Sequence, residues 1–352
     1  MFPSLRGLMS EATRLTRAGD LRAAMATIRS ALAARSPLAD VESVARQFPS
    51  SADIIDVEAL EVEASVPTAP PATGAFIQGS YTCADGARDY KLFVPPGADG
   101  RPLPLIVMLH GCTQGPDDFA RGTGMNDVAL ERGFYVLYPA QSQRVNPQRC
   151  WNWFKPRHQG RGQGEPALLA GMTREVMKHH DVDERRVYVA GLSAGGAMAA
   201  ILGEAYPDLF AAVGVHSGLP IGAATDVGSA LGAMKHGATI PGTSSGKSPV
   251  IVFHGDRDAT VHPLNGEQII AARTTARTPE VERGRSASGC EYTRRIYRDD
   301  DQRVVAEHWL IHGAAHAWSG GSSLGSYTDA RGPDATEELI RFLFANTRST
   351  VM

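Results

Sequence analysis

Residues 187–196, VYVAGLSAGG, decide the fold that the rest of the sequence has to fit. An apolar run of strand character leads directly into the pattern Gly-x-Ser-x-Gly, and the small apolar residues that follow favour a helix. A serine between a buried strand and a helix sits on a sharp, strained turn with its hydroxyl lifted above the sheet. Gly191 and Gly195 are small because such a turn brings other parts of the chain close to them. The stretch therefore predicts a strand–turn–helix unit with Ser193 at the turn.

The chain on both sides of this unit alternates between apolar runs and helical segments. Strand character appears in the ranges 89–95, 103–111, 134–140, 186–191, 210–218 and 248–255. Helical segments lie at roughly 118–132, 165–180, 195–206 and 334–346. Because strands joined through helices run parallel and are covered by those helices, the alternation predicts an α/β fold with a mostly parallel central sheet and helices on both faces.

Composition excludes several classes of function. The 352 residues are 43% hydrophobic and 21% charged, with a net charge of −3, so neither nucleic acid nor an anionic membrane is expected as a partner. No apolar run is long enough to span a bilayer, and no metal-ligand spacing of Cys and His occurs, so we expect no transmembrane segment, metal or cofactor. The N-terminus lacks the features of a signal peptide, which favours a cytoplasmic protein, or a secreted one if the N-terminus was trimmed.

The N-terminal part of the chain differs from the rest. Residues 1–36 show helical spacing on both sides of Gly19, which predicts a helical hairpin rich in arginine. A Pro/Ala-rich linker, 37–77, follows, and the main domain is expected over 78–352. The basic hairpin suits contact with a polymer granule, a lipid surface or a second subunit, and packing on the main domain is the simpler alternative.

A serine hydroxyl becomes a nucleophile only with a base and a group that orients the base. In the α/β-hydrolase fold the chain order is Ser, then Asp or Glu, then His. Asp256 and Asp258 both follow a buried strand, and we favour Asp258 as the acid. Of the later histidines, His308 and His312 fall on or at the end of a strand, whereas the Gly-flanked loop position 316 favours His316 as the base.

The run LHGC, 109–112, follows another buried strand and predicts half of an oxyanion hole. Two backbone N–H groups stabilise the tetrahedral oxyanion in such sites: one from the residue after the serine, here Ala194, and one from the loop after an earlier strand. The second donor is expected to be the N–H of Cys112. His110 precedes the serine in the chain and is expected to anchor the loop, not to act as the base.

Together, the motifs LHGCTQ, CWNWF, GLSAGGAMAA, HSGLP, HGDRDATVHP and GAAHAWSGG resemble the PHB-depolymerase-type carboxylesterases of the α/β-hydrolase superfamily. The resemblance covers roughly residues 78–346. It implies Ser193, Asp258 and His316 as catalytic triad, with Cys112 and Ala194 as oxyanion donors. It also points to Trp151, Trp153 and Trp318 as a substrate wall. Core packing is the alternative for Trp151 and Trp153, and their alternation favours Trp153 as the one that faces the cleft.

The cysteines are Cys83, Cys112, Cys150 and Cys290, which can pair in three ways. Because disulfides are rare in cytosolic proteins, free and partly buried thiols are expected. The resemblance leaves a Cys112–Cys150 bridge open, since secreted relatives often carry disulfides, and the sequence does not decide on a Cys83–Cys290 bridge.

The expected function is hydrolysis of poly(3-hydroxybutyrate) or its short oligomers through an acyl-enzyme, with no cofactor. Feruloyl, acetylxylan or general short-chain ester hydrolysis is the main alternative. A serine peptidase and a granule-surface scaffold acting through residues 1–36 are further alternatives. The family's secreted polymer depolymerases carry a signal peptide and a substrate-binding domain, which this sequence does not display. Residues 219–247, rich in Gly, Ala and Ser, are a candidate lid.

Overall fold

The computed structural model describes residues 73–98, 100–239, 248–274 and 278–348. All of them belong to the second of the chain's two units, Thr68–Met352. The predicted hairpin, 1–36, and most of the predicted linker, 37–77, lie outside the described residues. The main domain starts slightly earlier than expected, because its first strand begins at Ala75.

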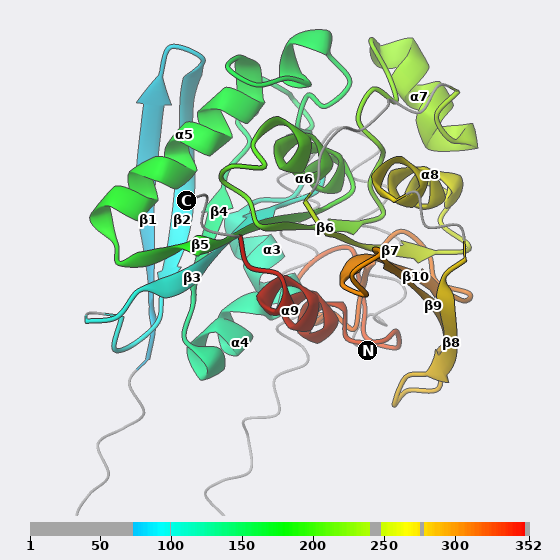
Figure 1. Ribbon diagram of the computed structural model, residues 1–352. Helices are drawn as coiled ribbons and strands as arrows, with labels where there is room; N and C mark the ends of the chain where they lie inside the picture. The colour runs from blue at the N-terminus through cyan, green and yellow to red at the C-terminus, as the bar shows by residue number, and fades with distance from the viewer. Residues whose placement is uncertain (1–72, 99, 240–247, 275–277, 349–352) are drawn as a thin grey trace, which may run out of the picture. The chain divides into compact units, whose positions relative to one another are not determined.

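A ten-stranded sheet forms the centre of the domain (Figure 1). In chain order its strands are β1 (Ala75–Cys83), β2 (Gly86–Val94), β3 (Leu103–Leu109), β4 (Tyr135–Pro139), β5 (Val182–Leu192), β6 (Ala212–His216), β7 (Val250–Gly255), β8 (Glu280–Arg285), β9 (Glu291–Arg298) and β10 (Val304–Ile311). Their order in the sheet is β1-β2-β4-β3-β5-β6-β7-β10-β9-β8. A separate two-stranded sheet pairs β11 (Trp318–Ser319) with β12 (Thr328–Asp329).

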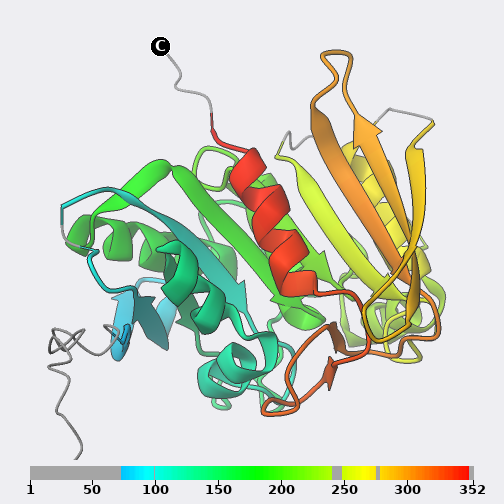
Figure 2. The ribbon, with the colours of Figure 1, turned by 90° about the horizontal axis from the view of Figure 1, so that it is seen from below.

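The strands from β4 to β10 in this order are parallel, which confirms the predicted sheet. The additions are antiparallel: β1–β2 joins one end through β4, and β9–β8 joins the other through β10. Figure 2 shows these antiparallel pairs at opposite ends of the sheet. The antiparallel ends were not predicted from the sequence.

Helices cover both faces of the sheet (Figure 1). In chain order they are α3 (Pro116–Thr123), α4 (Met125–Arg132), the 3₁₀ turn η1 (Pro156–His158), α5 (Gly164–His179), α6 (Ala194–Ala205), α7 (Val227–His236), α8 (Leu264–Arg273) and α9 (Ala335–Ala345). One apolar core lies between the sheet and α5, α6 and α8, and the other lies between the sheet and α3, α4 and α9. Strands β3 and β7 are buried along their whole length between these cores, as their continuous apolar sequences require.

Two predicted elements differ from the structure. The helix expected over 118–132 is two helices, since Gly124 adopts a left-handed conformation (φ 63°) that ends α3 and begins α4. The candidate lid, 219–247, contains α7, which is capped by the carboxylate of Asp226. Helix α7 is tied to the loop after β7, because the N–H of His262 donates to Met234 O at 2.7 Å.

Candidate active site

Ser193 lies at the turn between β5 and α6, as the sequence predicted. Its backbone has φ 59° and ψ −121°, a conformation that side-chain-bearing residues rarely adopt. The turn is tight enough that a Cβ on Gly195 would lie 2.0 Å from Leu109 O, and one on Gly191 would lie 2.4 Å from the Gly195 carbonyl carbon. Both glycines are therefore required by close backbone contacts, and α6 presents its N-terminal amides to Ser193.

Asp258 and His316 form a carboxylate–imidazole pair. Nδ1 of His316 lies 2.7 Å from Oδ2 of Asp258, and this Asp258 side chain is fully buried. The other carboxylate oxygen accepts the N–H groups of Thr260 at 2.9 Å and Val261 at 2.8 Å. Burial alone would raise the pKa of Asp258, but hydrogen bonds from His254 and His316 outweigh it and hold this pKa well below its usual range. The carboxylate is thus ionised and fixes His316 with its hydrogen on Nδ1.

Asp256 and His312, the competing candidates, form a pair of their own. His312 Nδ1 lies 2.9 Å from Asp256 Oδ2, and His312 Nε2 lies 2.9 Å from the hydroxyl of Thr293 on β9. Asp256 also accepts the N–H of Gly313 at 2.7 Å. These contacts tie the loop after β7 to the loop after β10, so Asp256 holds the two loops together. His308 lies buried on β10, where its Nδ1 is 3.3 Å from NH1 of Arg295.

His216, at the end of β6, joins the serine turn to the loop that carries His316. Its carbonyl accepts the N–H of Ser193 at 2.8 Å, and its Nε2 accepts the N–H of Ser319 at 3.0 Å. Burial lowers the pKa of His216 to about 3, so its ring is neutral. Within the described ranges, no hydrogen bond joins Ser193 Oγ to His316. Such bonds are often loose before a substrate binds.

The loop after β3 lies beside the serine. A Cβ on Gly111 would be 3.6 Å from Ser193 Cβ, and the Gly111 N–H donates to Gln114 Oε1 at 2.9 Å. Neither the Cys112 N–H nor the Ala194 N–H has an acceptor among the described residues. Both expected oxyanion donors are therefore free to bind the negative charge that develops on the carbonyl oxygen of a substrate at Ser193.

His110 holds this loop in place. Its Nε2 accepts the N–H of Gln141 at 3.1 Å, and its carbonyl accepts the indole N–H of Trp151 at 3.1 Å. Burial lowers the pKa of His110 to about 4, so the ring stays neutral. The anchoring role that the sequence suggested for His110 fits these contacts.

Cys112 and Cys150 form a disulfide with a Cα–Cα distance of 4.2 Å. The expectation of free thiols is therefore wrong for these two residues, and the bridge that the resemblance left open is present. The pairing could not be read from the sequence because it depends on the loops meeting in space. Cys83 and Cys290 are free, so the second bridge is not formed.

The tryptophans predicted as a substrate wall are mostly buried. Trp151 is 0% exposed and Trp318 is 2% exposed. The indole N–H of Trp318 donates to Thr336 Oγ1 at 3.0 Å, and its ring stacks on His216. These two residues pack inside the protein, which corrects the prediction. Trp153 is 5% exposed and its indole N–H has no protein partner in the described chain, so it is the one that stays a candidate for substrate contact.

A buried polar network beneath the CWNWF loop was missed by the sequence analysis. Glu165, at the start of α5, forms a buried ion pair with Arg88 at 3.2 Å. The same carboxylate accepts the Asn152 N–H at 2.7 Å and the side chain of Gln141. The partners lie 13, 24 and 77 residues from Glu165 in sequence, and only the acidic residue at the start of a buried helix face could have indicated the network. It fixes the loop that carries Cys150.

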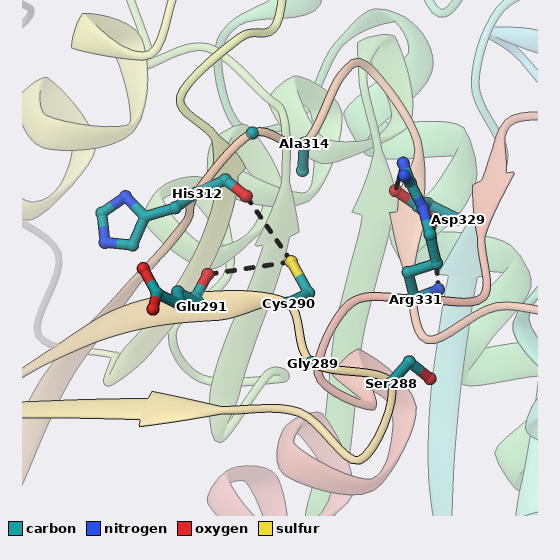
Figure 3. A pocket seen from close by; sticks show the side chains of 9 residues that line it. Ser288, Gly289, Cys290, Glu291, His312, Ala314, Asp329 and Arg331 are labelled. Carbon is teal, nitrogen blue, oxygen red and sulfur yellow. Dashed lines mark hydrogen bonds and ion pairs between the residues drawn. The ribbon is translucent and has the colours of Figure 1, made fainter.

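A cavity of about 460 Å³ lies outside this constellation (Figure 3). Cys290, Glu291, His312, Ala314, Asp329 and Arg331 line it, and the Cys290 thiol donates to backbone carbonyls of Glu291 and His312. Its charged groups are paired: Arg331 with Asp329 inside the lining, and Glu291 with Arg285 outside it. Ser193, Asp258 and His316 do not line this cavity.

The part of the chain that the structure describes contains no group of three or more His, Cys, Asp or Glu side chains placed to hold a metal ion. It also contains no helix of the length and apolarity that crossing a membrane requires.

Comparison with known proteins places the chain in a family. The model of the family described as Esterase PHB depolymerase matches residues 88–275. The chain belongs to this family. The resemblance drawn from its motifs is therefore confirmed. The range that matches the family model contains Ser193, Asp258 and the loop that carries Cys112.

Two curated proteins are similar to this chain in sequence. The chain is 31% identical over 240 residues to poly(3-hydroxyalkanoate) depolymerase C of Paucimonas lemoignei, a match that covers 63% of this chain and 56% of that protein. It is 30% identical over 233 residues to feruloyl esterase B of Thermothelomyces thermophilus, covering 60% of this chain and 78% of that protein. The chain thus spans little more than half the length of the first relative.

The fold is shared with a solved acetyl xylan esterase from Aspergillus awamori, with a TM-score of 0.59, 18% identity and coverage of 76% of this chain and 99% of that one. This likeness confirms the expected α/β-hydrolase fold with its mostly parallel sheet.

Proposed function

We propose that this member of the Esterase PHB depolymerase family is a serine carboxylester hydrolase that works through an acyl-enzyme. The observation that carries the proposal is the buried Asp258–His316 pair at 2.7 Å, with His316 on a loop that His216 links by hydrogen bonds to the strained turn of Ser193. Family membership supports the same chemistry.

Each residue has a role in this proposal. Asp258 stays ionised and keeps the hydrogen of His316 on Nδ1, so that Nε2 is free to take the proton of Ser193 Oγ. Ser193 attacks the ester carbonyl, and the N–H groups of Cys112 and Ala194 stabilise the oxyanion. His316 then returns the proton to the leaving alcohol, and water releases the acid by the reverse route. No metal or organic cofactor enters these steps.

We propose a polyester of short hydroxyacids, poly(3-hydroxybutyrate), or its oligomers as substrate. The name of the Paucimonas relative supports this class. The name of the Thermothelomyces relative, of which the chain covers 78%, favours a second candidate, a feruloyl or related small ester. A serine peptidase is less favoured because these relatives are named for ester substrates. A granule-surface role for residues 1–36 concerns residues outside the described ranges and remains a proposal.

We also propose that the enzyme acts in an oxidising compartment. Disulfides persist outside the cytosol and are rare within it. The Cys112–Cys150 bridge therefore favours the secreted alternative over the cytoplasmic one.

The experiment that tests the function compares hydrolysis of amorphous poly(3-hydroxybutyrate) granules, p-nitrophenyl butyrate and methyl ferulate by the wild type and Ser193→Ala. Serine-dependent clearing of granules is expected. Activity on the small esters alone would withdraw the polymer as substrate and keep the esterase. Retention of activity by a folded Ser193→Ala variant would overturn the mechanism.

A chain lacking residues 1–75 tests the N-terminal segment separately. Loss of granule binding with unchanged kinetics on p-nitrophenyl butyrate would support a docking role for that segment. Unchanged granule binding would remove that role.

A further inference from the structure

Two buried histidines lie behind the candidate acid, Asp258. His254 is on β7 and His308 is on the neighbouring strand β10, where His308 is paired with Val252. Helix α8 packs on these two strands (Figure 1), both rings lie against Gly266 of that helix, and both residues are at most 1% exposed. The proposed chemistry at Ser193 uses neither of them. An imidazole is polar, so its burial in the core requires an explanation.

His254 carries its hydrogen on Nε2. This nitrogen lies 2.8 Å from the carbonyl oxygen of Val261 and 3.5 Å from Oδ2 of Asp258. Both neighbours are acceptors only, so Nε2 is the donor. The other nitrogen, Nδ1, is then a bare acceptor, and it has no partner among the described residues.

His308 has the complementary arrangement. Its Nδ1 lies 3.3 Å from NH1 of Arg295 on β9, and a guanidinium can only donate. Burial, with smaller contributions from His254 and Arg295, lowers the pKa of His308 to about 3, so the ring is neutral. Its hydrogen is therefore on Nε2, which is buried and has no partner in the described chain.

The unpartnered acceptor and the unpartnered donor face the same place. A Cβ on Gly266 of α8 would lie 2.9 Å from His254 Nδ1 and 3.3 Å from His308 Nε2. A glycine at this helix position leaves room for the two rings, whereas any larger residue would press on both. Leaving a buried donor and a buried acceptor unpaired costs free energy, which a water molecule bonded to both would recover.

We propose that one buried water accepts from His308 Nε2–H and donates to His254 Nδ1, and that the linked pair positions the Asp258 carboxylate for His316. The proposal rests on the proposed function, since it treats Asp258 as the acid of that reaction. The resulting chain runs from Arg295 through His308 and His254 to Asp258. His254 and His308 are positioning residues, because they act on the reacting atoms only through Asp258.

The N–H of His254 can influence how strongly the Asp258 carboxylate holds a positive charge on His316. Titratable groups face Asp258 and His254 from β6 (His216), from β10 and β9 (His308 and Arg295) and from the loop after β10 (His316). Asp256 is paired with His312 outside this group. A carboxylate that loses one donor holds the imidazolium form of its remaining partner more strongly. Loss of His254 should therefore move the acid limb of the activity profile to higher pH.

The test uses the full chain with p-nitrophenyl butyrate and the variants His254→Leu, His254→Gln and Gly266→Ala. His254→Leu is expected to lower kcat by up to about 100-fold with little change in KM, since a small misplacement of a catalytic group has effects of this size. The acid limb of kcat/KM should move to higher pH. His254→Gln, which restores an N–H donor, should recover part of both, and Gly266→Ala should lower kcat by about 10-fold.

Gly232→Ala is the matched control. Gly232 lies in helix α7, and a Cβ there would meet nothing within 4 Å, so kinetics should be unchanged. Titration of the active serine with a fluorophosphonate corrects each rate for the amount of folded enzyme. If a His254 variant does not fold, kcat and the pH profile of kcat/KM are measured for His308→Gln and Gly266→Ala instead, and these decide on the proposal. Lower thermal stability with unchanged kcat and an unmoved acid limb would overturn the proposal. A fully active Ser193→Ala would instead overturn the function on which it rests.

Discussion

Oδ2 of Asp258 lies 2.7 Å from Nδ1 of His316, while the carboxylate of Asp256, two residues earlier, contacts His312 instead. Two acid–imidazole pairs thus lie on the same two loops. They differ in burial: the Asp258 side chain is fully buried, whereas Asp256 and His312 are about one third exposed. Only the buried pair adjoins His216 and, through it, the turn of Ser193.

This difference predicts opposite results for two matched substitutions. Asp258→Asn should lower kcat on p-nitrophenyl butyrate by about 10⁴-fold, as loss of the orienting carboxylate does in a Ser-His-Asp triad. Asp256→Asn removes a loop contact and should leave kcat close to that of the wild type. Steady-state kinetics at neutral pH measure both. A larger loss for Asp256→Asn would reassign the acid.

The disulfide should matter for both stability and rate. The bonded residues are 38 apart in sequence, so in the chain-entropy view the bridge contributes about 4 kcal/mol to the free energy of unfolding. Replacing Cys112 and Cys150 by Ser should lower stability by that order, measured by urea unfolding. It should also lower kcat, because the Cys112 N–H loses its fixed position. The control replaces Cys83 and Cys290 by Ser, and equal losses in both double variants would count against a special role of the bridge.

The buried ion pair of Arg88 and Glu165 provides a third test. Glu165→Ala leaves the guanidinium of Arg88 buried without its carboxylate, which should cost about 3–5 kcal/mol of stability. Glu175→Ala on the same helix removes an exposed partner of Lys178 and should cost less than about 1 kcal/mol. Urea unfolding of the two variants gives the comparison. Similar small losses for both would mean that the network does not hold the CWNWF loop.

Stability should fall as the pH falls below about 6.5, the ordinary pKa of histidine. Burial lowers the folded-state pKa of His110 to about 4 and those of His216 and His308 to about 3. Between these values and 6.5 the unfolded chain binds protons that the folded chain does not, so acid favours unfolding. Each histidine should contribute about 1.4 kcal/mol per pH unit.

Urea unfolding at pH 7.5, 6 and 5 measures this slope. The variant His308→Gln should reduce this slope by the contribution of one histidine. Asp258, whose pKa is also lowered by folding, adds a further loss only below about pH 4. A free energy of unfolding that does not change between pH 7.5 and 5 would contradict the assignment of neutral buried rings.

The sequence predicted the site best where the relevant information is local. The strand, the turn and the helix around Ser193 are consecutive, and Asp258 and His316 follow strands whose apolar runs are plain. It failed where partners meet only in three dimensions. Arg88 and Glu165 are 77 residues apart, and nothing near Cys112 indicates that Cys150 lies against it. The indoles of Trp151 and Trp318 suit a cleft as well as a core, so residue type alone could not decide their burial.

The order of strands in the sheet also has a consequence for synthesis of the chain. Strands β1, β2, β4 and β3 are neighbours in the sheet and come first in the described sequence, and the Cys112–Cys150 bridge closes within this half. A growing chain can therefore pair these strands and oxidise the two thiols before Ser193, Asp258 and His316 have left the ribosome exit tunnel. The loop that carries the Cys112 donor can thus be fixed in place before the Ala194 donor and the three proposed catalytic residues have emerged.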